Sequence, residues 1–331
     1  MVYNVKSKEH IFEGKKFFPQ CHASTLVALD NGDILSAWFA GSYEGHSDVA
    51  IWLSKRGQRG WSDPIKVADV EEMPCWNPVL FNDNKGTIFL FYKVGKTIPS
   101  WFTMFKTSTD DGDTWSEPKE LIKGDTGGRG PVRNKPIILS DNTFLAPASK
   151  ETETDWDAFV DISKDGGKTW TKSGMVPRDA DQFEGKGLIQ PTLWESKPGM
   201  VHMLIRSTEG FIYRSDSEDN GLSWSKAYPT DLPNNNSGID LIKLENGALV
   251  LVYNPIKGNW AARTPIVCSI SYDNGNSWED ELVLEHNEKP KDKTDGEFSY
   301  PAIVSRGNMV YITYTWKRRS VIFYEIEITI N

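Results

Sequence analysis

Short runs of apolar residues alternate with polar residues along the whole chain, and this period of two predicts β-strands. The first four runs cover residues 23–29, 33–40, 48–53 and 61–67, and they are rich in β-branched and aromatic residues. Asp30-Asn31-Gly32, between the first two runs, has the composition of a tight hairpin turn. No run has the length and period of a long helix, so the pattern predicts an all-β protein.

The same arrangement of runs recurs along the chain. Later units begin at residues 77, 135, 190, 237 and 300, and their second strands are expected at 88–92, 144–147, 201–206, 248–253 and 309–315. The last unit has only three runs, at 302–304, 309–315 and 321–328. We therefore expect the N-terminal stretch around His10–Glu13 to supply its fourth strand, which would remove exposed sheet edges.

An eight-residue pattern, Ser-x-Asp-x-Gly-x-x-Trp, fixes the length of the unit. Four full copies occupy residues 108–115, 163–170, 217–224 and 271–278, and a degenerate copy occupies 54–61. The five tryptophans are spaced by 54, 55, 54 and 54 residues. A constant period on this scale indicates a propeller or a solenoid, and a chain of 331 residues holds about six such units. Within the pattern, Asp and Gly suit a turn, and Trp provides a large buried surface at the start of the next strand.

The pattern resembles the Asp-box (BNR) repeat of the sialidase-like β-propellers. The resemblance implies a single domain over residues 1–331, built as a six-bladed β-propeller of four-stranded antiparallel blades. It also implies that the Asp boxes lie on the face away from the active site. Longer stretches, among them residues 41–52, 130–136 and 297–301, resemble the predicted-neuraminidase branch of that family, and the likeness covers essentially the whole chain.

Composition excludes several classes of partner. The net charge is −9 and the Lys and Arg residues are scattered, so nucleic-acid binding is not expected. No segment has the length and apolarity of a transmembrane span or a signal peptide. We therefore expect a cytoplasmic protein with no membrane partner, or a secreted or periplasmic one if a leader peptide has been removed. No signal for an oligomeric state stands out.

Cysteine and histidine usage indicates neither disulfides nor a metal centre. Cys21, Cys75 and Cys268 are an odd, widely spaced set without a zinc-site pattern, and are expected to be small buried side chains. No His/Asp cluster has ligand spacing, so no metal or other cofactor is expected.

In a propeller the first strand of every blade lines the central channel, so the strand starts predict a ring of residues at its mouth. All six are polar or ionisable: His22, Asn77, Lys135, Gln190, Ser237 and Tyr300. Neighbouring segments and the loops after the second strands should reach the same face. They add Glu44, His46, Asp48, Trp76, Arg133, Glu151, Arg206, Asp240, Arg263 and Arg318. Cations, carboxylates and aromatic rings on one concave face suit the binding of an acidic sugar.

The family resemblance implies roles for some of these residues. Sialidases of the superfamily use three arginines on the substrate carboxylate, a tyrosine nucleophile assisted by a glutamate, and an aspartate acid/base. By that likeness Tyr300 is the nucleophile and Arg206 one of the arginines, with Asp48 or Glu44 as the acid/base. The Arg-Ile-Pro motif expected before the first blade is absent, since residues 18–22 read Phe-Pro-Gln-Cys-His. Arg129, Arg133 and Arg263 are possible substitutes for the missing arginine.

Two alternatives remain open at this stage. His22 and Tyr300 should be neighbours across the ring closure, and such a pair with Lys135 or Arg206 opposite suits β-elimination from a uronic acid. That arrangement resembles certain polysaccharide lyases and rhamnosidases on propellers. The other alternative is a glycan-binding propeller without catalysis. The leading interpretation is an exo-glycosidase that removes a terminal acidic sugar, with an acidic glycan or oligosaccharide as its partner.

Overall fold

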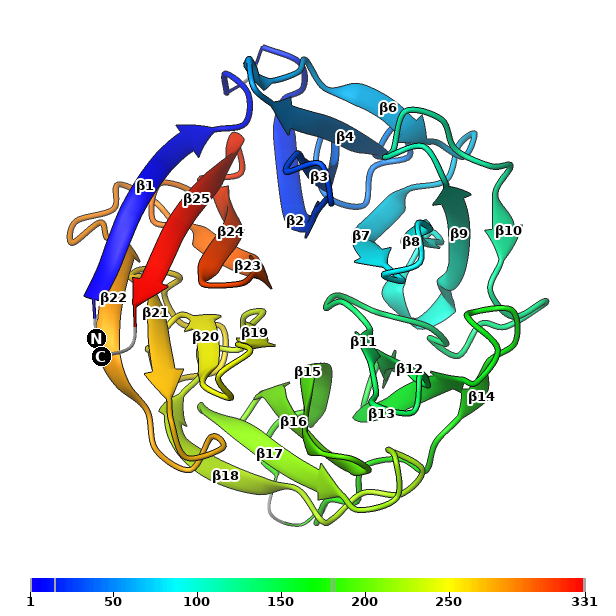
Figure 1. The fold of residues 1–331 in the computed structure, drawn as a ribbon, viewed down its shortest axis with the longest axis vertical. Helices are drawn as coiled ribbons and strands as arrows, with labels where there is room; N and C mark the ends of the chain where they lie inside the picture. Colours follow the sequence, from blue (N-terminus) through cyan, green and yellow to red (C-terminus); the bar gives the residue numbers. More distant parts are fainter. Residues whose placement is uncertain (1, 15, 180, 182, 330–331) are drawn as a thin grey trace.

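Six antiparallel sheets form a closed ring around a central channel in the computed structural model of the chain (Figure 1). The structure describes residues 2–14, 16–179, 181 and 183–329. This all-β, six-bladed propeller confirms the predicted fold class. A short helical turn, η1 (Ile98–Ser100), lies in a loop of blade two. Of the residues described, none forms a helix with the length and apolarity that a membrane crossing requires.

The blades follow one another in sequence, with the first strand of each blade nearest the channel (Figure 1). Blade one comprises β2 (Gln20–Ala28), β3 (Ile34–Gly41), β4 (Ala50–Gly57), β5 (Gly60–Trp61) and β6 (Ile65–Ala68). Blade two comprises β7 (Cys75–Asn82), β8 (Ile88–Val94), β9 (Phe102–Ser108) and β10 (Lys119–Glu120). Blade three comprises β11 (Ile137–Ile138), β12 (Phe144–Glu151), β13 (Trp156–Ser163) and β14 (Thr171–Lys172).

The second half of the ring repeats this arrangement. Blade four comprises β15 (Leu188–Lys197), β16 (Met200–Ser207), β17 (Phe211–Ser217) and β18 (Tyr228–Pro233). Blade five comprises β19 (Asp240–Lys243), β20 (Leu249–Tyr253), β21 (Ile266–Ser271) and β22 (Glu279–Glu285). Blade six comprises β23 (Phe298–Arg306), β24 (Met309–Trp316), β25 (Ser320–Thr329) and, from the other end of the chain, β1 (Val2–His10).

The N-terminal strand closes the ring, as expected, but it lies earlier in the chain than predicted. It spans Val2–His10 rather than His10–Glu13, and it pairs antiparallel with β25 from Val2 opposite Thr329 to His10 opposite Ile322. The strand is mostly exposed, and its residues after Val5 are all polar, so its sequence lacks the apolar alternation that identified the other strands. Ile11 and Phe12, which carry the apolar signal, are buried beyond its end.

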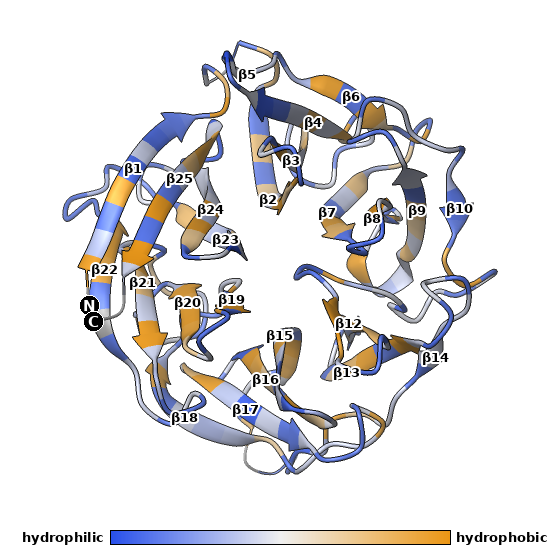
Figure 2. Cartoon of the chain, viewed as in Figure 1, coloured by the Kyte–Doolittle hydropathy of each residue, from blue (hydrophilic) through white to orange (hydrophobic). Residues whose placement is uncertain are grey.

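The apolar cores lie between neighbouring blades, and hydrophobic residues gather on the strands while most loops are hydrophilic (Figure 2). The repeated tryptophan of each unit packs against the preceding blade. Trp170 of blade three, for example, joins Phe89 and Phe91 of blade two, and Trp224 of blade four joins Leu145 and Val160 of blade three. The 54-residue period therefore reflects one blade-to-blade interface repeated around the ring.

The eight-residue repeats form the turns between the third and fourth strands, and we call these four segments the repeat turns. In the first, the Asp110 carboxylate accepts hydrogen bonds from the Ser108 hydroxyl (2.7 Å) and the Thr114 backbone N–H (2.9 Å). The Gly112 N–H donates to Ser108 Oγ at 2.9 Å, and φ at Gly112 is +81°. The Asp110 carboxylate thus satisfies backbone and hydroxyl donors of its own turn.

These hydrogen bonds predict a loss of stability in acid. The Thr114 hydroxyl and backbone N–H lower the pKa of Asp110 to about 2, and matching contacts lower that of Asp165 to about 2. Because the folded-state pKa lies below the ordinary value, the stabilisation is complete above pH ~4 and is lost as the pH falls towards 2.

We expect urea midpoints measured from pH 5 to pH 2 to fall less steeply for Asp110→Asn than for the unchanged protein. Asp111→Asn, in the same turn but outside the Ser108 and Thr114 hydrogen bonds, is the matched control and should keep the original slope. Equal slopes for all three proteins would contradict this account of the turns.

Candidate functional site

A cavity of about 160 Å³ lies at the end of the channel where the first strands begin. Its walls come from loops and strand ends of all six blades. The lining residues are Glu44, Trp76, Asn77, Ile98, Trp101, Glu151, Trp156, Gln190, Arg206, Trp260, Arg263, Tyr300 and Arg318. In this antiparallel arrangement the repeat turns lie at the opposite end of the channel, so the site and the repeat turns occupy different faces.

A backbone bulge places the central residues of this cavity. In β2, β7, β15 and β23 the pairing register shifts after His22, Trp76, Ile189 and Ser299. The residue that follows has a positive φ in each case: Ala23 (57°), Asn77 (39°), Gln190 (54°) and Tyr300 (54°). Bulges re-aim side chains and are common beside functional sites. The strand starts predicted from the sequence therefore match this bulge position in three blades, with Asn77, Gln190 and Tyr300. In blade one they do not, because His22 lies one residue before the bulge.

Three guanidinium groups surround the Tyr300 ring. Those of Arg133, Arg206 and Arg263 lie 5.3, 5.6 and 5.3 Å from its centroid. Arg133 is buried, donates to the Tyr300 and Pro301 carbonyls, and does not line the cavity. Burial lowers the pKa of Arg133 to about 10, so it remains a cation beneath the tyrosine at neutral pH. The floor of the cavity is therefore strongly positive.

Arg206 connects Tyr300 to two amide side chains. Its Nη1 donates to the Tyr300 hydroxyl at 2.7 Å and to Gln190 Oε1 at 2.9 Å, while its Nε donates to Asn236 Oδ1 at 2.7 Å. All its described hydrogen-bond acceptors are neutral, so its charge is available to an anion in the cavity. Gln190 stands beside the tyrosine hydroxyl as an amide, which cannot take a proton from it.

A chain of ion pairs joins blades five, six and one. Glu297 Oε1 accepts from Arg263 Nη1 at 2.7 Å and from Arg318 Nε at 2.8 Å, and Arg318 Nη1 donates to Glu44. Burial tends to raise the pKa of Glu297, but the two guanidiniums outweigh it and hold that pKa below the ordinary value. Glu297 is thus an ionised support that fixes two arginines at the cavity.

His22 packs against Tyr300 but does not line the cavity. The two ring centroids are 4.2 Å apart, His22 is 1% exposed, and its Nδ1 lies 2.9 Å from Thr315 Oγ1. Burial, reinforced by the surrounding arginines, holds the pKa of His22 well below its ordinary value, so the ring is neutral. The structure therefore brings the predicted His22–Tyr300 pair together and gives the histidine a packing position behind the tyrosine.

The carboxyl groups differ sharply in their surroundings. Glu151 lines the cavity and is buried, and this burial raises its pKa. Asp48 and His46, by contrast, are absent from the cavity lining. The Asp48 carboxylate accepts from the Ser42 N–H (3.0 Å) and hydroxyl (2.6 Å), and the His46 Nδ1 lies 2.8 Å from it. These two residues close their own loop, while Glu44 from the same loop reaches the cavity.

Lys135 and Asp240, predicted to bind substrate, bind each other below the cavity. Lys135 Nζ lies 3.0 and 2.9 Å from the Asp240 carboxylate oxygens and donates to the Leu241 carbonyl at 2.9 Å. Asp240 also accepts from the Thr192 hydroxyl at 2.9 Å and from the Ile303 N–H at 3.0 Å. Ser237 is likewise buried and outside the cavity lining. The Lys135–Asp240 pair therefore ties blades three to six together.

Aromatic rings form much of the cavity wall. Trp76, Trp101 and Trp156 are 7%, 2% and 8% exposed, whereas Trp260 is 59% exposed at the rim. Arg206 lies 5.8 Å from the Trp156 ring and 5.6 Å from the Trp260 ring. A second hollow of about 450 Å³ shares Trp260, Arg263 and Arg318 with the cavity. The site thus opens towards blades five and six, with room for more than one sugar unit.

Sequence reasoning did not single out Trp101, Trp156, Trp260 or Glu297 as site residues. Trp260 lies in the connection between the second and third strands of its blade, which is the signal that had drawn attention to Arg263, and Trp156 begins the third strand of blade three. Glu297 stands three residues before Tyr300, close to a strand start. No pattern in the sequence around Glu297 predicts that it pairs with two arginines from other loops.

The contacts of Lys135 predict a structural role. Lys135→Met should leave the Asp240 carboxylate buried without its cation and lower the free energy of unfolding by about 3–5 kcal/mol. Lys66→Met, which removes an exposed ion pair with Asp69, is the matched control and should cost less than about 1 kcal/mol. Chemical denaturation measures both. An unchanged stability combined with lost ligand binding would instead assign Lys135 to the substrate.

Comparisons with known proteins agree with this architecture. A Hadza microbial sialidase superposes with a TM-score of 0.78 at 18% identity, covering 97% of this chain and 68% of that protein. The NanB sialidase from Streptococcus pneumoniae gives 0.76 at 16% identity, covering 97% and 70%. A Dyadobacter fermentans protein of unknown function gives 0.79 at 16% identity, covering 99% of both chains. At these identities the likeness shows a shared fold.

A search of curated proteins found no match. The family model described as a BNR repeat-like domain matches residues 32–312, which is most of the chain. The protein therefore belongs to the BNR repeat-like, sialidase-like β-propeller family.

Proposed function

We propose that the protein is a sialidase-like exo-glycosidase that removes a terminal acidic sugar from a glycan. The observation that carries this proposal is the group of three arginines, Arg206, Arg263 and Arg318, that line one cavity together with Tyr300. Three cations on one small cavity suit a substrate with a carboxylate, and the tryptophan walls suit the apolar faces of sugar rings. The solved sialidases that share the fold are consistent with a glycan substrate.

Tyr300 is the proposed nucleophile. A phenol approaches the anomeric carbon of a carboxylate-bearing sugar without the repulsion that a carboxylate nucleophile would meet. The hydrogen bond from Arg206 Nη1 to the phenolic oxygen, at 2.7 Å, favours negative charge on that oxygen as the bond to carbon forms. His22, packed at 4.2 Å between centroids, holds the ring in place from behind.

Two cavity carboxyls would divide the proton transfers. Glu151, whose pKa is raised by burial, is suited to donate a proton to the leaving oxygen. Glu44, ion-paired with Arg318, is the carboxylate suited to accept the phenolic proton. As the bond from Tyr300 to the anomeric carbon forms, the glycosidic carbon–oxygen bond breaks and the aglycone leaves as an alcohol. Water then releases the sugar from Tyr300. Asp48, bound to Ser42 and His46, is a weaker candidate for either step.

Activity on two substrate classes tests this proposal. We expect a fluorogenic sialoside to be hydrolysed by the protein and not by Tyr300→Phe, which keeps the ring but removes the nucleophile. A uronate-containing oligosaccharide, followed by the ultraviolet absorbance of an unsaturated uronate, tests the lyase alternative. The absorbance without sialoside hydrolysis would overturn the proposal in favour of β-elimination. Binding of an acidic sugar without turnover of either substrate would favour the glycan-binding alternative.

Dependence on the leaving group tests the role of Glu151. For a substrate with an alkyl leaving group, Glu151→Gln should lower kcat by about 10²–10⁴-fold, because protonation of the departing oxygen is lost. For an aryl leaving group that departs without protonation, the loss should be much smaller. Asp48→Asn is the comparison variant and should show no such difference. The leaving-group pattern appearing in Asp48→Asn alone would move the acid to Asp48.

A further inference from the structure

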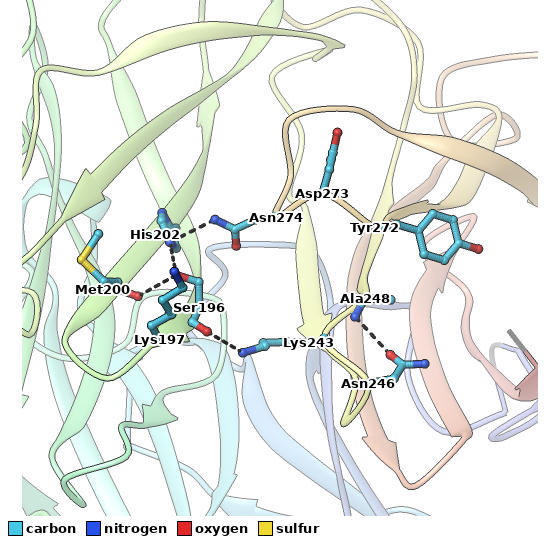
Figure 3. Close-up of a pocket in the computed structure, with 11 residues that line it drawn as sticks. Ser196, Lys197, Met200, His202, Lys243, Asn246, Ala248, Tyr272, Asp273 and Asn274 are labelled. Atoms are coloured by element: carbon cyan, nitrogen blue, oxygen red, sulfur yellow. Dashed lines mark hydrogen bonds between the residues drawn. The ribbon is translucent and has the colours of Figure 1, made fainter.

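A second cluster of reactive side chains lies at the opposite end of the propeller, between blades four and five. There Ser196, His202 and Asn274 border an open pocket of about 670 Å³, to which the fourth repeat turn also contributes (Figure 3). Figure 3 shows the His202 ring flanked by the Ser196 hydroxyl and the Asn274 amide. The chemistry proposed for the cavity of Tyr300 uses none of these residues.

Three neighbouring strands position the cluster. His202 on β16 lies directly opposite Asp216 on β17. Ser196 falls where the register between β15 and β16 shifts, between Glu195 and Lys197, so a bulge turns its side chain towards the histidine. Ser196 Oγ lies 2.7 Å from His202 Nε2, and Asp216 Oδ1 is hydrogen-bonded to His202 Nδ1.

The contacts assign the protons on the imidazole. Asp216 is an acceptor, because its carboxylate also receives the Arg214 Nε–H (2.9 Å) and the Tyr228 hydroxyl (2.8 Å). Arg214 Nη2 also lies 3.2 Å from His202 Nδ1, and the Ser196 hydroxyl lies 3.5 Å from the Met200 carbonyl as well. We assign the hydrogen to Nδ1, because Asp216 accepts there, while Nε2 faces the Ser196 hydroxyl and the Asn274 amide N–H and presents its lone pair to them. Burial tends to raise the pKa of Asp216, but hydrogen bonds from His202, Tyr228 and Arg214 outweigh it and lower that pKa to about 2. Trp194 stacks on the imidazole with centroids 5.0 Å apart and fixes its plane.

Asn274 adds a fixed donor beside the imidazole. Its Oδ1 accepts the Trp194 indole N–H at 2.7 Å, which turns its Nδ2 towards His202 Nε2 at 3.3 Å. Lys243 Nζ donates to the carbonyls of Glu195 (2.7 Å) and Ser196 (3.2 Å) and thereby holds the backbone of the bulge. The hydroxyl, the imidazole lone pair and an amide donor therefore meet at the pocket wall.

We propose that Ser196, His202 and Asp216 form a nucleophilic triad that cleaves short-chain acyl esters, with the Asn274 amide stabilising the oxyanion. Nucleophile, base and base-orienting carboxylate have the hydrogen-bonded order that acyl transfer requires, and such constellations are identified by geometry rather than by fold. The pocket is open and shallow enough for a small ester rather than a long chain, since its volume of about 670 Å³ is spread between two hairpins and a turn.

The reaction balances without a further reagent. Ser196 Oγ bonds to the ester carbonyl carbon while its proton passes to His202 Nε2, and the carbonyl oxygen becomes an oxyanion facing Asn274 Nδ2. The carbon–oxygen bond to the alcohol then breaks, and His202 returns the proton to the leaving alcohol. Water attacks the acyl-serine by the same route, so the products are a carboxylic acid and an alcohol.

A fluorophosphonate probe tests the nucleophile directly on the full chain. We expect one adduct, mapped by mass spectrometry to Ser196, and none in Ser196→Ala. Ser140→Ala is the matched control, because Ser140 is an exposed serine on the neighbouring blade whose hydroxyl donates to Glu195 rather than to a histidine. The Ser140→Ala protein should be labelled at Ser196 to the same extent as the unchanged protein. No adduct on Ser196 in the folded, unmodified protein would overturn the proposal.

Hydrolysis of p-nitrophenyl acetate tests the other members. Ser196→Ala and His202→Gln should each lower kcat at least about 10³-fold relative to Ser140→Ala. Asn274→Gly, which tolerates the positive φ of 62° at this position, should lower kcat about 10²–10³-fold with little change in KM. Because removal of His202 or Asn274 loses packing against Trp194, thermal unfolding is measured in parallel. Ester hydrolysis that persists in Ser196→Ala would equally contradict the triad.

Discussion

The buried carboxylate of Asp240 is the contact on which the geometry of the ring depends. It receives the Lys135 ammonium from blade three, the Thr192 hydroxyl from blade four and the Ile303 N–H from blade six, while its own backbone belongs to blade five. A charge removed from water is stable only when donors surround it in good geometry, so each of these blades must hold its first strand at a fixed radius. The apolar cores between blades give the ring its cohesion. Asp240 instead fixes how far each blade stands from the axis.

Because the first strands are held at a fixed radius, a strained backbone conformation can persist where they begin, at the cavity. Four first strands carry a residue with positive φ, and in Tyr300 this places a bulky side chain in a conformation that costs of order 1–3 kcal/mol. Arg133 holds the carbonyls of Tyr300 and Pro301 from across the channel, and His22 packs on the ring. The hydroxyl of Tyr300 is thus held against Arg206 by contacts on three sides of the residue. Such preorganisation is what a nucleophile needs, because no reorganisation is then required when charge develops.

Much of this architecture could be predicted because it follows from local, repeated signals. The tryptophan period identified the blades, since each of these rings fills an interface with the preceding blade. Counting from them located Asn77 and Gln190, and analogy with those strand starts located Tyr300 in the blade that lacks a repeat. The N-terminal strand was misplaced because Val2–His10 is mostly exposed, has no regular apolar alternation and is defined by its pairing with β25.

The remainder of the site depends on contacts between residues far apart in the sequence. Arg318 reaches Glu44 across the ring closure, 274 residues away. Lys135, a cation at a strand start, points down the channel to Asp240 rather than up into the cavity. The hydrophobic periodicity of a strand does not indicate whether a side chain at its start points down the channel or into the cavity. For Asp48 a short-range contact decides the outcome. Its carboxylate accepts hydrogen bonds from Ser42 in the same loop and therefore does not line the cavity.

The two ends of the propeller offer different kinds of chemistry for a physical reason. At the end with Tyr300, six blades converge, and five of them contribute a charged side chain to one cavity: Glu44, Glu151, Arg206, Arg263 and Arg318. At the other end, the pocket beside Ser196 and His202 is lined by two neighbouring blades, four and five. Polar side chains there are set by one hairpin and the adjoining turn, as His202 is by Ser196, Asp216 and Asn274. A repeat architecture can therefore acquire a local site at one blade interface without disturbing the central one, because the two sites share strands but no side chains.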